Sequence, residues 1–180
     1  TLELELPGNI QFTPYFALEA PAGKRLTIYT DSYVDSDNNP NFKDTYVTAE
    51  GAQQFENYAW RSGTKLYIEA EAGVKFTSLG YRKSEFNGNW AGSFHSDDEK
   101  LDQLWQESLN TVAICMRDTY MDCPERERGP YMGDASNQID AALYGYDQGG
   151  LDMTKKAILS CLGWTPESGA IPSRAPSVKP

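Results

Sequence analysis

The sequence is poor in histidine and cysteine. One histidine, His95, stands among 180 residues, which argues against catalytic machinery of the Ser-His-Asp or Cys-His type. The three cysteines, Cys115, Cys123 and Cys161, are odd in number and are not spaced as metal-binding pairs, so a disulfide framework and a zinc site are both disfavoured. We expect His95 to lie just before a helix, Cys123 to be a small buried residue, and no cofactor or metal to be bound.

Basic residues and long apolar runs are also scarce. The chain has 16 Lys and Arg against 26 Asp and Glu, a formal charge of −10, which argues against nucleic acid and anionic membranes as partners and suits a neutral substrate. No apolar run approaches the roughly 18 residues that a membrane-spanning helix needs. No secretory signal is recognised and the first residue is Thr1, so we expect a processed or excised piece. Its compartment is left open between cytoplasm and secretion or periplasm.

The first half of the sequence carries the alternating pattern of short β-strands. Strands are expected near residues 2–6, 26–29, 46–48, 54–60, 66–70 and 74–81. Turn signals separate them at Pro7-Gly8, Ala22-Gly23, Asp37–Pro40, Ser62-Gly63 and Ala72-Gly73. Short strands at this spacing predict an antiparallel β-sandwich.

A helical pattern begins at Ser96. The run Ser96-Asp-Asp-Glu99 is a capping box, predicted to open a helix that ends near Arg117. A second helix is predicted over 135–146, stopped by Gln148-Gly-Gly150, and a third over 152–162. The residues expected to face inward on these two helices are Ile139, Ala142, Leu143, Tyr146, Ala157, Ile158, Cys161 and Leu162. The tail, 165–180, should be an extended loop.

These patterns predict two domains. A β-sandwich is expected over 1–93, followed over 94–180 by the opening part of a larger helical domain that is truncated in this chain. Three helices cannot close a helical barrel, which is why we expect further helices beyond Pro180.

The densest cluster of charge lies between the first two predicted helices. Within thirteen positions the chain places Asp122, Glu125, Arg126, Glu127, Arg128 and Asp134. Interspersed prolines and glycines predict a loop, because neither residue suits the interior of a helix or strand. Sugar-cleaving enzymes carry catalytic carboxylates on such loops, although a charge-dense loop is more often only solvated surface.

The segment Met116–Ala135, with its Asp-Cys-Pro-x-Arg-Glu followed by Gly-Asp, resembles the start of the catalytic domain of bacterial α-L-rhamnosidases. Residues 53–60 and 72–82 are similar to the β-sandwich that precedes this domain, 94–105 to its first helix, and 171–176 to a later loop. The resemblance implies an antiparallel β-sandwich followed by the first helices of an (α/α)6 barrel. It also implies an inverting glycoside hydrolase that cleaves terminal α-L-rhamnosides.

The resemblance assigns roles to four residues of the loop. Glu127 matches the general acid, Asp122 and Asp134 match aspartates that bind sugar hydroxyls, and Arg126 matches the arginine beside the acid. The general base is expected outside this chain, so the isolated chain should be inactive. The partners implied are a rhamnose-containing carbohydrate and the rest of the catalytic domain.

Two aromatic residues complete the predicted substrate site. Tyr131 stands where many family members have a tryptophan, and Trp164 is the best placed of the tryptophans to stack on sugar. Structural alternatives stay open for both aspartates. For Asp134 the alternative is the N-cap of the second helix, and for Asp122 it is a turn-forming residue before Cys-Pro.

A general acid must stay protonated near neutral pH, which needs a raised pKa. Neighbouring carboxylates raise the pKa of a glutamate and neighbouring arginines lower it. We hypothesise that Glu127 faces the carboxylates while Arg126 and Arg128 turn away to hold the loop. Two other functions are kept as alternatives: a non-catalytic carbohydrate-binding or structural β-sandwich module, and a six-hairpin hydrolase acting on another sugar.

Overall fold

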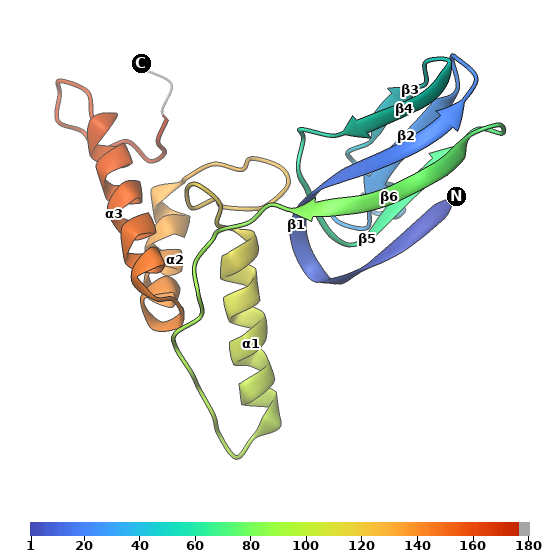
Figure 1. Cartoon of the computed structure of the whole chain (residues 1–180). Helices are drawn as coiled ribbons and strands as arrows, with labels where there is room; N and C mark the ends of the chain where they lie inside the picture. The colour runs from blue at the N-terminus through green and yellow to red at the C-terminus, as the bar shows by residue number, and fades with distance from the viewer. Residues whose placement is uncertain (177–180) are drawn as a thin grey trace. The chain divides into compact units, whose positions relative to one another are not determined.

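The computed structural model describes residues 1–176, and its contacts divide the chain into two compact units, one over residues 1–84 and one from residue 85 onward. Figure 1 shows strands in the first unit and helices in the second. The predicted fold class, antiparallel β followed by α, is confirmed. Residues 177–180 of the predicted tail lie outside the described residues.

The first unit is one hydrogen-bonded sheet of six strands. They are β1 (Leu2–Ala20), β2 (Arg25–Thr30), β3 (Asp44–Val47), β4 (Gly51–Glu56), β5 (Arg61–Ala70) and β6 (Lys75–Lys83). All pairings are antiparallel, in the order β3-β2-β5-β1-β4, with β6 also on β1. The N-terminal part of β1 pairs with β5, while its C-terminal part lies between β4 and β6. The long β1 bends between these partners (Figure 1), so the sheet curls around a core.

The core of this unit follows from the alternation of side chains along each strand. Its buried residues are Ile10, Phe12, Phe16, Leu18, Ala20, Leu26, Ile28, Leu66 and Ile68. Phe16 lies at the centre, with ring centroids of Tyr46, Phe55 and Phe76 at 5.1, 5.4 and 5.9 Å. Because these rings come from β3, β4 and β6, one side chain joins both parts of the curled sheet.

Two predicted turns in the β unit are wrong. Pro7-Gly8 lies within β1 and Ser62-Gly63 within β5. The register between these strands shifts between Glu5 and Ile10, and Ile10 then pairs with Gly63, whose φ is 156°. An antiparallel ladder absorbs irregular residues as a bulge and continues, so local turn signals do not end the strand.

Over the described residues 85–176, the second unit contains three helices: α1 (Glu99–Ile114), α2 (Met132–Gly145) and α3 (Gln148–Gly163). Their buried core consists of Val112, Met116, Tyr120, Ala135, Ala142, Tyr146, Met153 and Ala157. Residues 85–93 belong to this unit by contact, whereas the change of sequence pattern put them with the β part. The amides of Ala91 and Gly92 donate to the Gly145 carbonyl at 3.0 and 3.2 Å. A Cβ on Gly92 would lie 1.8 Å from the Tyr144 carbonyl oxygen, so only glycine permits this approach.

The predicted capping box of α1 is wrong, although a helix does follow it. Asp98 is the N-cap, and its side chain accepts from the Lys100 amide at 2.9 Å. Asp102 reaches back instead of Glu99, accepting from the Ser96 amide at 2.8 Å and contacting His95 Nδ1 at 2.7 Å. An aspartate cap satisfies the first amides as well as serine does, and here the acid nearest the helix takes the position.

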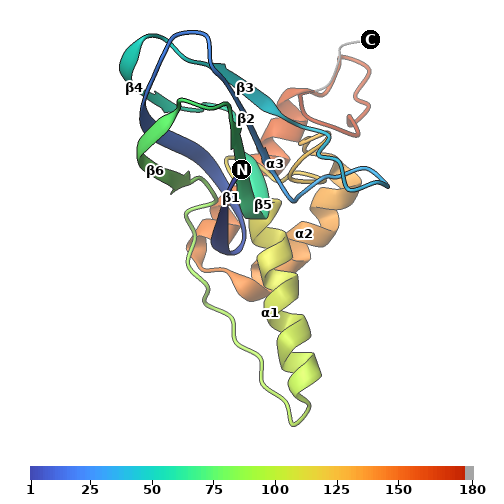
Figure 2. The same ribbon diagram turned by 90° about the vertical axis from the view of Figure 1, so that its right-hand side faces the viewer.

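The sequence predicted that Gln148-Gly-Gly150 would stop the second helix, and this prediction is wrong. These residues lie in the first turn of α3. Only Tyr146 and Asp147 separate the two helices, and Asp147 caps α3 by accepting from the Gly149 amide at 2.9 Å. A Cβ on Gly150 would lie 2.8 Å from Tyr146 Cβ. Glycine therefore allows α2 and α3 to lie side by side, as both Figure 1 and Figure 2 show.

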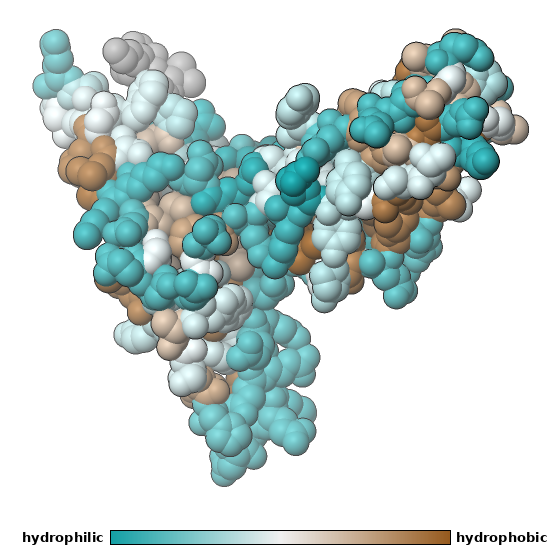
Figure 3. Space-filling model, viewed as in Figure 1, coloured by the Kyte–Doolittle hydropathy of each residue, from teal (hydrophilic) through white to brown (hydrophobic). Residues whose placement is uncertain are grey.

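Three residues predicted to face inward are exposed: Leu143 at 48%, Ile158 at 46% and Leu162 at 55%. Helix α3 has apolar residues on more than one side, and periodicity alone does not tell which side meets α2. Figure 3 shows apolar surface along α3. Within residues 1–176, no helix combines the length and apolar character needed to cross a membrane.

Candidate functional site

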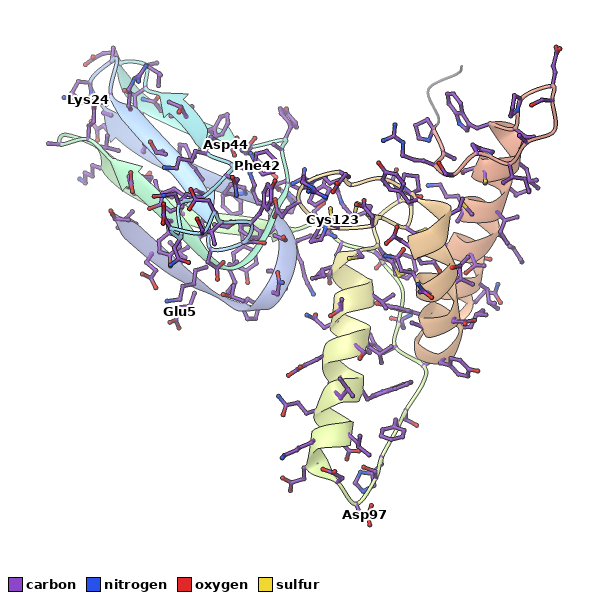
Figure 4. All side chains as sticks on the ribbon, turned by 180° about the vertical axis from the view of Figure 1, so that it is seen from behind. Glu5, Lys24, Phe42, Asp44, Asp97 and Cys123 are labelled. Atoms are coloured by element: carbon purple, nitrogen blue, oxygen red, sulfur yellow. The ribbon has the colours of Figure 1, made fainter. Side chains whose placement is uncertain are left out.

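The charged loop runs from Cys115 to Tyr131, between α1 and α2, and Figure 4 marks Cys123 within it. Its first residues are anchored in the helical core. Tyr120 is fully buried, and its hydroxyl lies 3.0 Å from Thr154 Oγ1 on α3. Further along, the Met121 carbonyl accepts from Gln138 Nε2 on α2 at 2.6 Å. The loop is therefore held at its start by side chains from both neighbouring helices.

Asp122 closes the charged part of the loop on itself. Its amide donates to the Gly129 carbonyl at 2.9 Å, and its Oδ1 accepts from the Gly129 amide at 2.8 Å. The carboxylate thus bonds seven residues onward rather than two, so the turn predicted as its structural alternative is not formed. One carboxylate oxygen fixes the loop, which leaves Oδ2 as the atom that can accept from a ligand.

Glu127 is paired with an arginine. Its Oε1 forms an ion pair with Arg126 Nη2, and its Oε2 accepts from Cys123 Sγ at 3.2 Å. The hydrogen bond from Arg126, and after it the one from Cys123, lowers the pKa of Glu127 from 4.5 to about 2. The hypothesis that both arginines turn away from Glu127 is therefore wrong for Arg126. In this state Glu127 is a carboxylate and not an acid.

Arg128 does turn away and holds the loop, as hypothesised. Its Nη2 donates to Glu125 Oε2 at 3.2 Å and its Nε to the Pro124 carbonyl at 3.0 Å. Glu125 is only 6% exposed, so the pair is largely withdrawn from water. The φ of Arg128 is 52°, a conformation that few residues other than glycine adopt. Ion pair and backbone together shape the turn that presents Glu127.

Asp134 lies in the first turn of α2 and is exposed. The N-cap of α2 is Tyr131, without a side-chain capping bond, so the alternative role of Asp134 as N-cap is wrong. A carboxylate in the first turn is favoured by the helix dipole and still points its oxygens to solvent. The side chain is therefore available to a ligand.

A contact that the sequence did not reveal joins Tyr131 to Arg174, in the loop after α3. The two residues form an isolated β-bridge, and the Met132 amide donates to the Ser173 carbonyl at 2.8 Å. Arg174 Nη1 donates to the Tyr131 hydroxyl at 3.2 Å, and its guanidinium carbon lies 5.3 Å from the ring centroid. The sequence pointed to the loop 171–176 but not to this arginine, since nothing local distinguishes it.

Of the predicted site residues, the structure brings the ligand atoms of Asp122 and Glu127 close together on the charged loop. Tyr131 is the N-cap of α2 and Asp134 lies in the first turn of that helix. Trp164 is the C-cap of α3 and is 42% exposed. Its role in sugar stacking stays a prediction.

One group of side chains has the geometry of a partial cation site. Ligand atoms of Asp122, Cys123 and Glu127 lie within 4.8 Å of one another. Cys123 Sγ already donates to Glu127 Oε2, and Asp122 Oδ1 already accepts from the Gly129 amide that closes the loop. Exposed acidic groups at this spacing are common without an ion, so the expectation that no metal is bound stays a prediction.

A curled antiparallel sheet is thus followed by three helices, with an acid-rich loop between the first two. Residues 89–180 match the model of the bacterial alpha-L-rhamnosidase six-hairpin glycosidase domain. The chain belongs to this family.

Solved structures share the fold over nearly the whole chain. A GH78 family rhamnosidase of Bacillus sp. GL1 matches with a TM-score of 0.82 and 24% identity, over 97% of this chain and 19% of that one. A rhamnosidase from Klebsiella oxytoca with rhamnose bound matches with a TM-score of 0.79 and 14% identity, over 96% of this chain and 37% of that one. The chain therefore spans well under half of either structure. Comparison with curated proteins gives no match.

Proposed function

We propose that the protein to which this chain belongs is an inverting glycoside hydrolase that cleaves terminal α-L-rhamnosides. The observation that carries the proposal is the loop that holds Asp122 and Glu127 together in a chain of the rhamnosidase family. Both matching structures are rhamnosidases, and one has rhamnose bound. These likenesses support the substrate class.

In this proposal Glu127 is the general acid, which protonates the leaving oxygen of the glycosidic bond. Inversion needs a second carboxyl group about 6.5–9.5 Å away with a water beside it. The family resemblance puts this general base, a glutamate, outside this chain. Asp122 and Asp134 accept hydrogen bonds from sugar hydroxyls. They discriminate against other epimers, since a wrong sugar leaves a polar group unpaired.

The Arg126 ion pair sets a condition on this mechanism. Glu127 donates a proton only after Arg126 leaves it, because the pair keeps the pKa of Glu127 at about 2. The Arg126 side chain is 67% exposed, where an ion pair contributes little net stability, so we propose that Arg126 turns toward a sugar hydroxyl when substrate binds. Substrate binding would then raise the pKa of Glu127 and draw Arg126 into the substrate site in one movement.

The test is hydrolysis of an aryl α-L-rhamnoside by the full-length protein and by its Glu127→Gln variant. Loss of a general acid lowers the rate by roughly 10² to 10⁴, so kcat should fall by that factor. Glu107→Gln, an exposed glutamate on α1, is the matched control and should keep the wild-type rate. Equal rates in Glu127→Gln and wild type would reject the assignment of the acid.

Aryl glycosides of other sugars test the specificity in the same assay. Tyr131 stands where a tryptophan is common in this family, and a smaller ring offers less stacking area. Faster release from another glycoside than from the rhamnoside would favour a six-hairpin hydrolase acting on that sugar.

A further inference from the structure

The outer face of the β unit has two hollows that adjoin. One, of about 410 Å³, is lined among others by Tyr15, Gln54 and Arg82, and the other, of about 390 Å³, by Glu19, Gln54 and Thr77. Ala17 and Gln54 line both, so the hollows form one groove along β1 between β4 and β6. Each volume falls within the range of roughly 300–1,000 Å³ typical of small-molecule sites.

Alternation along β1 explains why this face is hollow. Phe16 and Leu18 point into the core, so Tyr15, Ala17 and Glu19 point outward. In register with Ala17 stand Gln54 on β4 and Ser78 on β6. Ala17 is small and stands between Tyr15 and Glu19 on β1, so it leaves a depression at the centre of the face. The polar side chains of Gln54 and Ser78 lie on either side of it.

An aromatic ring is built into one end of the groove. Tyr15 lies against Gly80 of β6: a Cβ at that glycine would come within 2.5 Å of the Tyr15 hydroxyl oxygen. Tyr15 as a whole is 37% exposed, and the close approach to Gly80 sets the position of its ring. A fixed, half-exposed tyrosine offers apolar area at little cost in conformational entropy.

Planar polar groups stand beside this ring. Arg82 Nε and Nη2 donate to Glu56 Oε1 and Oε2 at 2.7 and 3.2 Å, and Thr13 Oγ1 lies 3.4 Å from Oε1. This pairing lowers the pKa of Glu56, so the carboxylate is ionised and its charge is balanced by Arg82. A guanidinium has five N–H donors, so donors beyond the pair are left for a ligand.

The balance of charge favours a neutral ligand. The whole sequence carries −10, yet Glu56 in the groove is neutralised by Arg82, and Glu19 stands in register with Lys75. An aromatic surface flanked by amide, hydroxyl and guanidinium groups matches a sugar ring, which has an apolar C–H face and hydroxyls at its rim. We propose that this groove, between β4 and β6, binds a neutral saccharide. The site lies within residues 1–84 and is independent of the proposed chemistry on the charged loop.

The test is NMR titration of the 180-residue chain, labelled with ¹⁵N, by methyl α-L-rhamnoside and by the rhamnosyl-glucose disaccharide rutinose. The amide chemical shifts of residues in β1, β4 and β6 should change with added sugar and reach saturation. The disaccharide should bind more tightly, because the groove has two hollows. Tyr15→Ala should weaken binding at least tenfold. Tyr58→Ala removes a tyrosine that is 98% exposed and does not line the groove, so its affinity should stay within twofold of wild type.

Further variants separate the outcomes. Ala17→Phe fills the centre of the groove from a position that is already partly exposed, so it tests the site even if Tyr15→Ala unfolds. Asp122→Asn should leave the shifts in the β unit unchanged, whereas it would abolish them if the sugar bound only at the charged loop. The proposal is overturned if neither sugar causes saturable shifts in these strands, or if Ala17→Phe binds as tightly as wild type. In the same titration of the full-length protein, binding that Tyr15→Ala weakens must still be observed. If it is not, another part of the protein covers this face and the proposal is overturned.

Discussion

The Arg126–Glu127 ion pair leads to a prediction about the protonation of the proposed acid. With the pair intact the pKa of Glu127 is about 2, against an ordinary value of 4.5. At pH 6 a carboxyl with the lower pKa is protonated in roughly one molecule in 10,000, and one with the ordinary pKa in roughly one in 30. Replacing Arg126 by Gln should therefore raise the protonated fraction of Glu127 by about two orders of magnitude.

The measurement is the pH dependence of the Glu127 side-chain ¹³C shift in the 180-residue chain, assigned with Glu127→Gln. We expect the midpoint to move from about 2 in wild type toward 4.5 in Arg126→Gln. Cys123→Ala should cause a smaller rise, since the thiol hydrogen bond is the second cause of the shift. Arg128→Gln is the comparison variant: because Arg128 bonds Glu125 and not Glu127, it should move the Glu127 midpoint much less than Arg126→Gln does.

The same pair affects stability in a defined pH window. Because the folded-state pKa of Glu127 is depressed, the ion pair stabilises the folded state above pH 4.5, and this contribution is lost as the pH falls toward 2. Arg126→Gln should flatten that part of the stability profile. A wild-type midpoint near 4.5, or an equal shift in Arg126→Gln and Arg128→Gln, would refute the reasoning.

Two further predictions concern the contacts that hold the site and the helices. Arg174→Ala removes the guanidinium that donates to Tyr131, so in the full-length protein we expect KM for an aryl α-L-rhamnoside to rise severalfold with kcat less affected; Arg174→Lys, which keeps the charge but not the planar fork, should restore little. Gly150→Ala places a Cβ 2.8 Å from Tyr146 Cβ, and this overpacking should lower the free energy of unfolding by about 1–2 kcal/mol after the gain in helix propensity, as measured by urea denaturation.

Each of these predictions has a matched control. For Arg174 the control is Arg117→Ala on the same unit. If kcat falls and KM rises to the same extent in both variants, the cause is general damage to the fold and not displacement of Tyr131. For Gly150 the control is Gly163→Ala at the end of α3, where an added Cβ meets nothing within 4 Å. Equal stability of Gly150→Ala and wild type would mean that α2 and α3 are not in close contact there.

The prediction of the fold from sequence succeeded where a periodic pattern of apolar residues continues over many consecutive positions. The 3.6-residue period of α1 extends over many residues, so a single misleading residue does not hide it. The failures lie where a local signal competes with strand pairing or helix packing. Pro7-Gly8 was predicted as a turn, but β1 continues through it with an irregularity in its pairing to β5. Gly149-Gly150 was predicted to end a helix, but these glycines lie at the start of α3, where Gly150 allows close contact with Tyr146.

The candidate site shows the same division. The acids and the prolines between them are local features, so the loop and its residues could be identified from the sequence and from a family resemblance. Which arginine pairs with which glutamate could not, because Arg126 and Arg128 are both near Glu127 in sequence. Their partners depend on the backbone turn at Arg128, whose φ is 52°, and on the burial of Glu125. Through-space contacts of this kind have no periodic signature.

By itself, the sequence determined the order of β and α elements, the loop that carries the acids and the family to which the chain belongs. These depend on patterns that each stretch of chain carries alone: side-chain alternation, helical periodicity and proline placement. Only the tertiary structure decided that Arg126 keeps Glu127 ionised, that Arg174 holds Tyr131 and that a groove lies on the outer face of β1. These depend on distances between residues far apart in the chain or on backbone turns, which are set only when each unit folds.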